Sequence, residues 1–168
     1  ASSLIHIIDA SGSTDGEGNP CEPGKHDPKE DVKFLEKEID HWLKGILKEN
    51  WDKVSRKLEV DGGKIHKVLH DRLSGLGISE SKVVSALREI DFSKEPKDWD
   101  DQELFELAKV IRRRSKPITI AANKSDISSS EEIEALKELD YPVIATSAEY
   151  ELALRKADEQ GIVDYIPG

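Results

Sequence analysis

Residues 118–126 read ITIAANKSD, and this stretch decides the fold class. The apolar run from Ile118 to Ala122 predicts a buried strand of a sheet. The polar residues N-K-S-D that follow predict a loop at the carboxyl end of that strand, where ligands of open parallel sheets bind. The stretch therefore predicts an α/β fold with a ligand-binding loop at residues 123–126.

Two further strands and a series of helices surround this stretch. The apolar run LIHII at 4–8 predicts a strand buried on both faces of a parallel sheet, and the shorter run at 142–146 predicts a third strand. Helices are predicted where apolar residues recur at three- and four-residue spacing, and capping signals such as Asp27-Pro28 mark their starts. The predicted helices span 27–47, 51–58, 64–74, 79–90, 100–114, 128–139 and 148–160.

The order of these elements predicts one α/β domain interrupted by a helical insertion. Strands and helices alternate after residue 98, whereas 27–97 contains only helices. We expect residues 1–26 and 98–168 to form a parallel-sheet, Rossmann-like domain. Residues 27–97 are expected to form an all-helical insertion after the first strand.

Composition limits the classes of function. The 168 residues carry a formal net charge of -10, and 36% of them are charged. An acidic surface repels phosphate, which argues against binding nucleic acid or membranes through bulk charge. No apolar stretch approaches the about 18 residues that span a bilayer, and the single cysteine cannot form an internal disulfide. We expect a cytoplasmic protein with no membrane contact.

The chemistry of guanine matches the residue types in N-K-S-D. Guanine presents two adjacent donors, N1–H and the exocyclic amino group, beside the acceptor O6. A carboxylate accepts both donors, so Asp126 is the expected base reader, and loss of this pair would cost on the order of 2 to 4 kcal/mol. Asn123 would anchor the loop and reach the base, while the stem of Lys124 would lie along the purine or ribose. The plainer alternative is that Asn123 and Asp126 only cap a helix.

A second polar turn, Thr146-Ser147-Ala148, follows where a predicted strand gives way to a helix. The backbone N–H of Ala148 is the expected donor to O6, and Ser147 Oγ is available to orient Asp126. The two turns together predict a guanine-nucleotide site formed by Asn123, Lys124, Asp126, Ser147 and Ala148.

The opening LIHIIDASGSTD, the motifs ANKSD and TSAEYELALRKA, and the ending YIPG resemble the YchF-type branch of the Obg-related P-loop GTPases, in its archaeal form. The resemblance covers nearly the whole chain and is weaker in the middle of the insertion. It implies that the first strand is the fourth strand of a GTPase domain and that residues near 27–97 are the family's inserted helical domain. It implies GTP or GDP as the ligand, with Asn123, Lys124 and Asp126 reading the base and Ser147-Ala148 as the second base-reading motif. It also implies an association with ribosomes and translation.

The motifs for phosphate and metal chemistry are not found in these residues. No G-x-x-x-x-G-K-[ST] occurs in the 168 residues. The resemblance implies that the phosphate loop, the switch regions and the metal-binding D-x-x-G lie upstream in a longer chain, and that Mg²⁺ binds only with that half. Asp9-Ala10-Ser11-Gly12 fits D-x-x-G formally, but we interpret it as a strand-end turn in which Asp9 accepts local N–H bonds. We therefore expect no catalytic or metal-binding residues here, little GTP hydrolysis by this chain alone, and a GTP affinity no better than about millimolar.

Other hypotheses stay open. The helical block could be an interaction module for a protein or ribosomal partner, or the chain could complete a nucleotide site in trans with a P-loop chain. The basic run Arg112–Arg114 most simply offsets a helix dipole, and contact with ribosomal RNA is its alternative. Trp42, Trp51 and Trp99 are expected in the core of the insertion. The outer edge of the first strand is expected to invite self-association.

Overall fold

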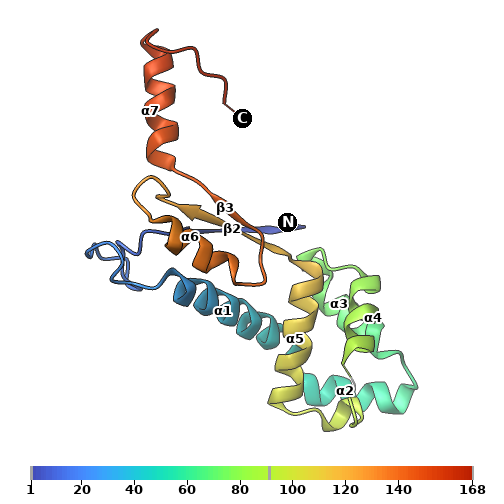
Figure 1. The fold of residues 1–168 in the computed structure, drawn as a ribbon. Helices are drawn as coiled ribbons and strands as arrows, with labels where there is room; N and C mark the ends of the chain where they lie inside the picture. The colour runs from blue at the N-terminus through green and yellow to red at the C-terminus, as the bar shows by residue number, and fades with distance from the viewer. Residues whose placement is uncertain (1, 91, 168) are drawn as a thin grey trace. The chain divides into compact units, whose positions relative to one another are not determined.

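The computed structural model describes residues 2–90 and 92–167, and the fold is α/β (Figure 1). Three strands form one sheet in the order β1 (Leu4–Asp9), β2 (Ile118–Asn123) and β3 (Val143–Ala145). β2 and β3 pair in parallel, with Ile120 opposite Val143. The predicted fold class is confirmed, and all three predicted strands are present.

Each predicted helix is present, with its ends shifted by a few residues. Asp100 and Ser129 each form a capping box with the glutamate three residues later, which fixes the starts of two helices. Ser79 occupies the N-cap position of α4, but its hydroxyl bonds to the Ser81 hydroxyl instead of the helix backbone. The helices are α1 (Pro28–Lys48), α2 (Trp51–Asp61), α3 (Ile65–Leu73), α4 (Glu80–Glu89), α5 (Asp101–Ser115), α6 (Ser130–Lys137) and α7 (Ala148–Glu159).

The chain divides into two compact units. We call Ala1–Leu4 with Phe34–Pro117 the helical unit, and Ile5–Lys33 with Ile118–Gly168 the sheet unit. α5, which we expected in the α/β domain, lies in the helical unit because its apolar face is buried in the core of that unit. The assignment of separate functions to 27–97 and to the rest of the chain stays a prediction.

The helical unit is built around stacked aromatic rings and a continuous apolar cluster. Trp51 and Trp99 stack with ring centroids 5.5 Å apart, and Phe92 stacks on Trp99. Trp42 is 57% exposed, so its predicted place in the core is wrong. The inward face of α1 is taken by Leu43 and Leu47, one turn apart, and the cluster also includes Leu69, Leu73, Ile78, Val83, Leu104, Leu107 and Ile111.

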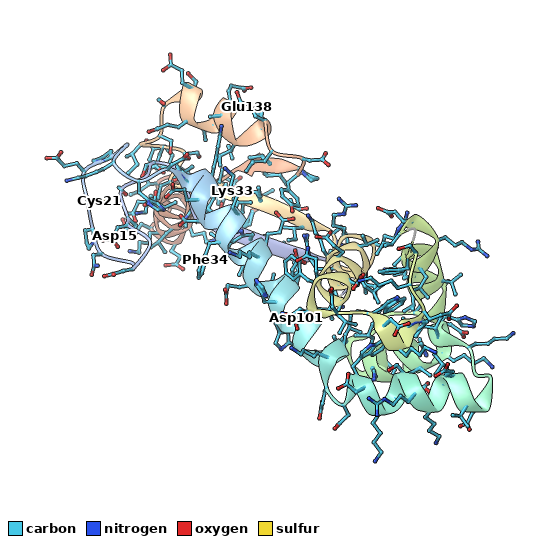
Figure 2. The ribbon with its side chains drawn as sticks, turned by 90° about the horizontal axis from the view of Figure 1, so that it is seen from below. Asp15, Cys21, Lys33, Phe34, Asp101 and Glu138 are labelled. Atoms are coloured by element: carbon cyan, nitrogen blue, oxygen red, sulfur yellow. The ribbon has the colours of Figure 1, made fainter. Side chains whose placement is uncertain are left out.

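Charge pairs join α1 to α5 within this unit. Asp101, labelled at the start of α5 in Figure 2, accepts hydrogen bonds from Lys44 Nζ at 2.6 Å and Lys48 Nζ at 2.5 Å. These bonds lower the pKa of Asp101 to about 2. Both ion pairs contribute little to stability, because Asp101 is exposed and exposed ion pairs are screened by solvent.

The most buried charge of the unit is Arg112. It is 1% exposed, and its Nε donates to Asp40 Oδ1 at 2.7 Å while its Nη2 donates to Glu36 Oε1 at 2.5 Å. Arg113 and Arg114 both pair with Glu89. All three arginines lie in the last turn of α5, where cations oppose the helix dipole. The alternative of RNA contact is wrong for Arg112, because its guanidinium is enclosed with two carboxylates.

The sheet unit buries one face of its sheet. Ile8, Ala10, Ile120 and Ala122 pack with Val32 from the start of α1 and Leu136 from α6. Figure 1 shows α6 beside the strands. Ile5 and Ile7, which alternate with the partly buried His6 and the buried Ile8, are 73% and 67% exposed, so the predicted burial of β1 on both faces is wrong. The described residues thus leave an apolar surface on β1 uncovered.

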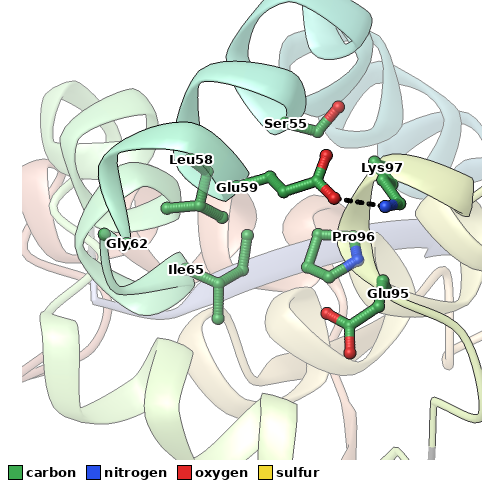
Figure 3. Close-up of a pocket in the computed structure, with 9 residues that line it drawn as sticks. Ser55, Leu58, Glu59, Gly62, Ile65, Glu95, Pro96 and Lys97 are labelled. Carbon is green, nitrogen blue, oxygen red and sulfur yellow. Dashed lines mark hydrogen bonds and ion pairs between the residues drawn. The ribbon is translucent and has the colours of Figure 1, made fainter.

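An open pocket of about 450 Å³ lies in the helical unit (Figure 3). Leu58, Ile65 and Pro96 supply apolar walls, and Glu59 pairs with Lys97 at its margin. None of the predicted site residues lines this pocket.

In the part of the chain that the structure describes, no helix is long and apolar enough to cross a membrane.

Candidate functional site

The carboxyl ends of the three strands meet at one edge of the sheet unit. Ala10 N, just after β1, donates to Asn123 O at 2.9 Å. Thr146 N donates to Ala122 O at 2.9 Å, and Ser125 N donates to Thr146 O at 3.0 Å. The loops after β1, β2 and β3 are therefore fixed to one another through backbone hydrogen bonds, as expected for a parallel sheet.

The loop after β2 turns sharply at Lys124. Its φ of 61° lies in the left-handed region, which costs a non-glycine residue about 1 to 2 kcal/mol. Its carbonyl oxygen accepts hydrogen bonds from the backbone N–H groups of Ile127 and Ser128 and from the Ser128 hydroxyl. The surrounding bonds hold this backbone conformation, a situation that is common at binding sites.

The structure brings the five predicted site residues together. Ser147 Oγ donates to Asp126 Oδ1 at 2.6 Å and also accepts from Tyr150 N as the N-cap of α7. The same hydroxyl therefore connects the carboxylate of one loop to the first turn of the helix after the next strand. Lys124 lies between Asn123 and Asp126 in the loop.

One contact differs from the predicted arrangement. The N–H of Ala148, expected to point at a base oxygen, donates to Asn123 Oδ1 at 3.0 Å. Asn123 thus anchors the loop after β3 as well as its own loop after β2. The physical reason is that this N–H belongs to the first turn of α7, where it has no acceptor within the helix.

Asp9 has a larger role than a local turn. It accepts from Ser11 N at 3.1 Å, as the turn interpretation requires, and also from the hydroxyls of Ser11, Ser13 and Thr14. Lys124 Nζ donates to Asp9 Oδ2 at 2.8 Å. Burial raises the pKa of Asp9, but the hydrogen bonds from Lys124 and the hydroxyls outweigh it and hold the pKa well below its usual range. Asp9 is therefore an anion fixed by one cation and several donors.

Sequence reasoning did not identify Ser13 and Thr14 with this site. Lys124 Nζ donates to Ser13 Oγ at 3.0 Å and to Thr14 Oγ1 at 3.1 Å, across more than a hundred residues of sequence. Both lie at the start of the loop after β1, in which Figure 2 labels Asp15 and Cys21. The available signal was the hydroxyl-rich run S-G-S-T directly after a strand whose carboxyl end faces the same edge as Asn123.

Residues 121–168 match the Obg-like GTPase YGR210-like, G4 motif-containing domain. This segment contains Asn123, Lys124, Asp126, Ser147 and Ala148, and it begins within β2. The G4 domain match therefore covers the loops after β2 and β3, whereas Asp9, Ser13 and Thr14 lie outside it.

The whole chain is similar to longer GTP-binding proteins. An uncharacterized GTP-binding protein of Methanocaldococcus jannaschii is 49% identical over 166 residues, which are 97% of this chain and 41% of that protein. One from Schizosaccharomyces pombe is 29% identical over 171 residues, covering 100% of this chain and 41% of that protein. The crystal structure of a GTP binding protein from Pyrococcus horikoshii OT3 superposes with a TM-score of 0.88 at 43% identity, covering 99% of this chain and 49% of that one. The chain thus spans less than half the length of these relatives.

Proposed function

We propose that the loops after β2 and β3 bind the base of guanine nucleotides, as part of a YchF-type, Obg-related GTPase associated with translation. The observation that carries the proposal is the 2.6 Å hydrogen bond from Ser147 Oγ to Asp126 Oδ1. It fixes the carboxylate, while Asp126 Oδ2 has no hydrogen-bond partner among the residues that the structure describes. A fixed carboxylate with free acceptor capacity suits the paired N1–H and amino donors of guanine. Adenine lacks this pair of donors.

The other residues complete the base site. The methylene stem of Lys124 lies along the purine, and O6 takes the N–H of Ala148 in place of Asn123 Oδ1. That exchange frees the Asn123 carboxamide to contact the base. Because no phosphate-loop motif occurs in the 168 residues, we expect affinity no better than about millimolar and little hydrolysis by this chain alone. We expect Mg²⁺ to bind only together with a phosphate loop.

A two-dimensional NMR titration of the 168-residue protein tests the base site. We expect GDP at millimolar concentration to shift the amide signals of residues 123–126 and 146–148, and ADP to leave them in place. Asp126→Ala should abolish the GDP shifts, because guanine loses its acceptor. Asp126→Asn should bind xanthosine diphosphate better than GDP, because xanthine carries a carbonyl acceptor where guanine carries its amino group.

The matched control is Asp140→Ala, which removes a carboxylate after α6 and outside the five site residues. It should titrate as the unsubstituted protein does. Equal shifts with GDP and ADP, or GDP binding that survives Asp126→Ala, would contradict the proposed base site.

We also propose that the uncovered surface of β1 causes self-association of this chain. β1 is an end strand of the sheet, and edge strands with exposed apolar side chains pair or aggregate. We expect sedimentation velocity to show species larger than the monomer at about 100 µM, and Ile5→Lys/Ile7→Lys to restore the monomer. Ile162→Lys, an equally apolar and exposed position after α7, serves as the control. A monomer at every concentration would rule the proposal out.

A further inference from the structure

The ammonium group of Lys124 is fully occupied by the last residue of β1 and the loop that follows it. A lysine ammonium has three N–H donors. Here they have three acceptors, Asp9 Oδ2 at 2.8 Å, Ser13 Oγ at 3.0 Å and Thr14 Oγ1 at 3.1 Å. The charge of Lys124 is therefore committed to this loop, and its methylene stem is the part left for a ligand.

The acceptors are themselves held in place. Ser13 and Thr14 each donate a hydroxyl hydrogen bond to Asp9 Oδ2, at 2.9 and 2.7 Å. Ser11 bonds to the other carboxylate oxygen through its N–H and its hydroxyl. Asp9 is the common partner of all these groups, and its side chain is only 12% exposed. Charge-assisted hydrogen bonds in such a sheltered cluster are stronger than those in water.

The backbone of Lys124 needs this support. Its left-handed conformation is unfavourable for a side chain, yet it determines where the stem starts and how the loop to Asp126 turns. The ammonium is held by Asp9 at one end of the side chain, and the carbonyl of Lys124 is held by Ser128 at the other. Both ends of the residue are therefore fixed before any ligand arrives.

We propose that Asp9, acting with the hydroxyls of Ser13 and Thr14, is the positioning residue for Lys124 in the guanine site. It holds the ammonium away from the nucleotide, so that the lysine presents its stem rather than its charge to the purine. Asp9 touches no ligand in this role and acts only through Lys124. The carboxyl end of β1 thereby becomes part of a base site whose other residues follow β2 and β3.

A double-mutant cycle measured by NMR titration tests the positioning role. Asp9→Asn keeps the shape and removes the charge, and we expect about fivefold weaker binding of GMP, the loss expected when one charge-assisted bond is removed. Lys124→Met, which keeps an unbranched stem, should weaken binding to a similar extent. Asp9→Asn should then have no further effect in the Lys124→Met background, because its whole influence passes through the ammonium. GMP and GDP should show the same fold-losses, since the lysine charge does not contact phosphate.

The controls separate this role from general stability and from the base site itself. Asp15→Asn alters an exposed carboxylate of the same loop that bonds only within residues 15–19, and it should bind GMP as the unsubstituted protein does. Because the role rests on the proposed guanine site, Asp126→Ala is measured in parallel. GMP binding that survives Asp126→Ala overturns the base site. Loss in Asp126→Ala combined with unchanged affinity in Asp9→Asn, or with additive losses in the cycle, overturns only the positioning role.

A second variant covers the case in which Asp9→Asn does not fold. Thr14→Val removes one acceptor of the ammonium and preserves the size of the side chain. A loss of GMP affinity that disappears in the Lys124→Met background supports the positioning role. Unchanged affinity in Thr14→Val overturns it.

Discussion

Replacing Arg112 with methionine is expected to destabilise the helical unit by about 3 to 5 kcal/mol, the cost of removing one partner of a buried ion pair. Arg112 is 1% exposed, and its substitution leaves the Asp40 carboxylate buried without a cation. All three tryptophans lie in the helical unit, so urea unfolding followed by tryptophan fluorescence reports on this unit alone. The midpoint should shift strongly to lower urea concentration.

Two further variants identify the cause. Arg113→Met removes the neighbouring arginine, which pairs with Glu89 at the surface, and should cost at most about 1 kcal/mol. Arg112→Met/Asp40→Leu removes both buried charges and should recover much of the lost stability, because apolar replacement of a buried pair is often neutral. An Arg112→Met protein as stable as Arg113→Met would show that burial of this charge is not what holds the helices.

The apolar spacing predicted most elements well because they have one buried stripe or face, whereas the structure describes no buried residue in α7. The same spacing could have located Arg112. It lies four residues after Ala108 and eight after Leu104, on the inward side of α5, and a charge there requires buried partners. Those partners, Asp40 and Glu36, are more than seventy residues away, so local pattern could not name them. Trp42 was misplaced because the buried face of α1 runs through Asp40, Leu43 and Leu47, and a residue next to Leu43 is turned about 100° away from it.

The candidate site also has one part that the sequence predicted and one part that it did not. Asn123, Lys124, Asp126, Ser147 and Ala148 were predicted together because strand–loop–helix boundaries place their loops at the carboxyl edge of a parallel sheet. The network of Asp9, Ser13 and Thr14 depends on which side chains of a long polar loop return to the sheet. No periodicity encodes that return, since it is set by turns and by backbone hydrogen bonds.

Gly12 lies where the loop after β1 folds back toward the sheet. Gly12→Ala is expected to destabilise the sheet unit by about 3 kcal/mol. Its φ of 57° costs alanine about 1 to 2 kcal/mol. A Cβ at this position would also lie 2.2 Å from the backbone oxygen of His26, and such overpacking typically costs a further 1 to 3 kcal/mol. The contact is with backbone, so no side chain can move aside to relieve it.

The clash breaks the closure of the loop. Gly24 N donates to Ser11 O at 2.8 Å and His26 N donates to Gly12 O at 3.2 Å, so the end of the loop is bonded to its beginning. Hydrogen exchange followed by mass spectrometry should show faster exchange across residues 11–26 in Gly12→Ala. Gly18→Ala is the matched control, because Gly18 also has a positive φ of 85° but nothing lies within 4 Å of an added Cβ. It should cost only about 1 to 2 kcal/mol of conformational strain, without the added clash.

The effect should extend to the proposed base site through Lys124. If Ser13 and Thr14 lose their fixed positions, the ammonium loses two of its three acceptors, and the protein should bind GMP more weakly. Gly18→Ala leaves those hydroxyls in place and should keep its GMP affinity. Faster exchange in Gly12→Ala with unchanged GMP affinity would separate the loop from the lysine, whereas unchanged exchange would show that the backbone tolerates the added methyl group. The combination of fast exchange and weak binding is expected because one carboxylate, Asp9, connects the loop to Lys124, which we propose lies along the purine.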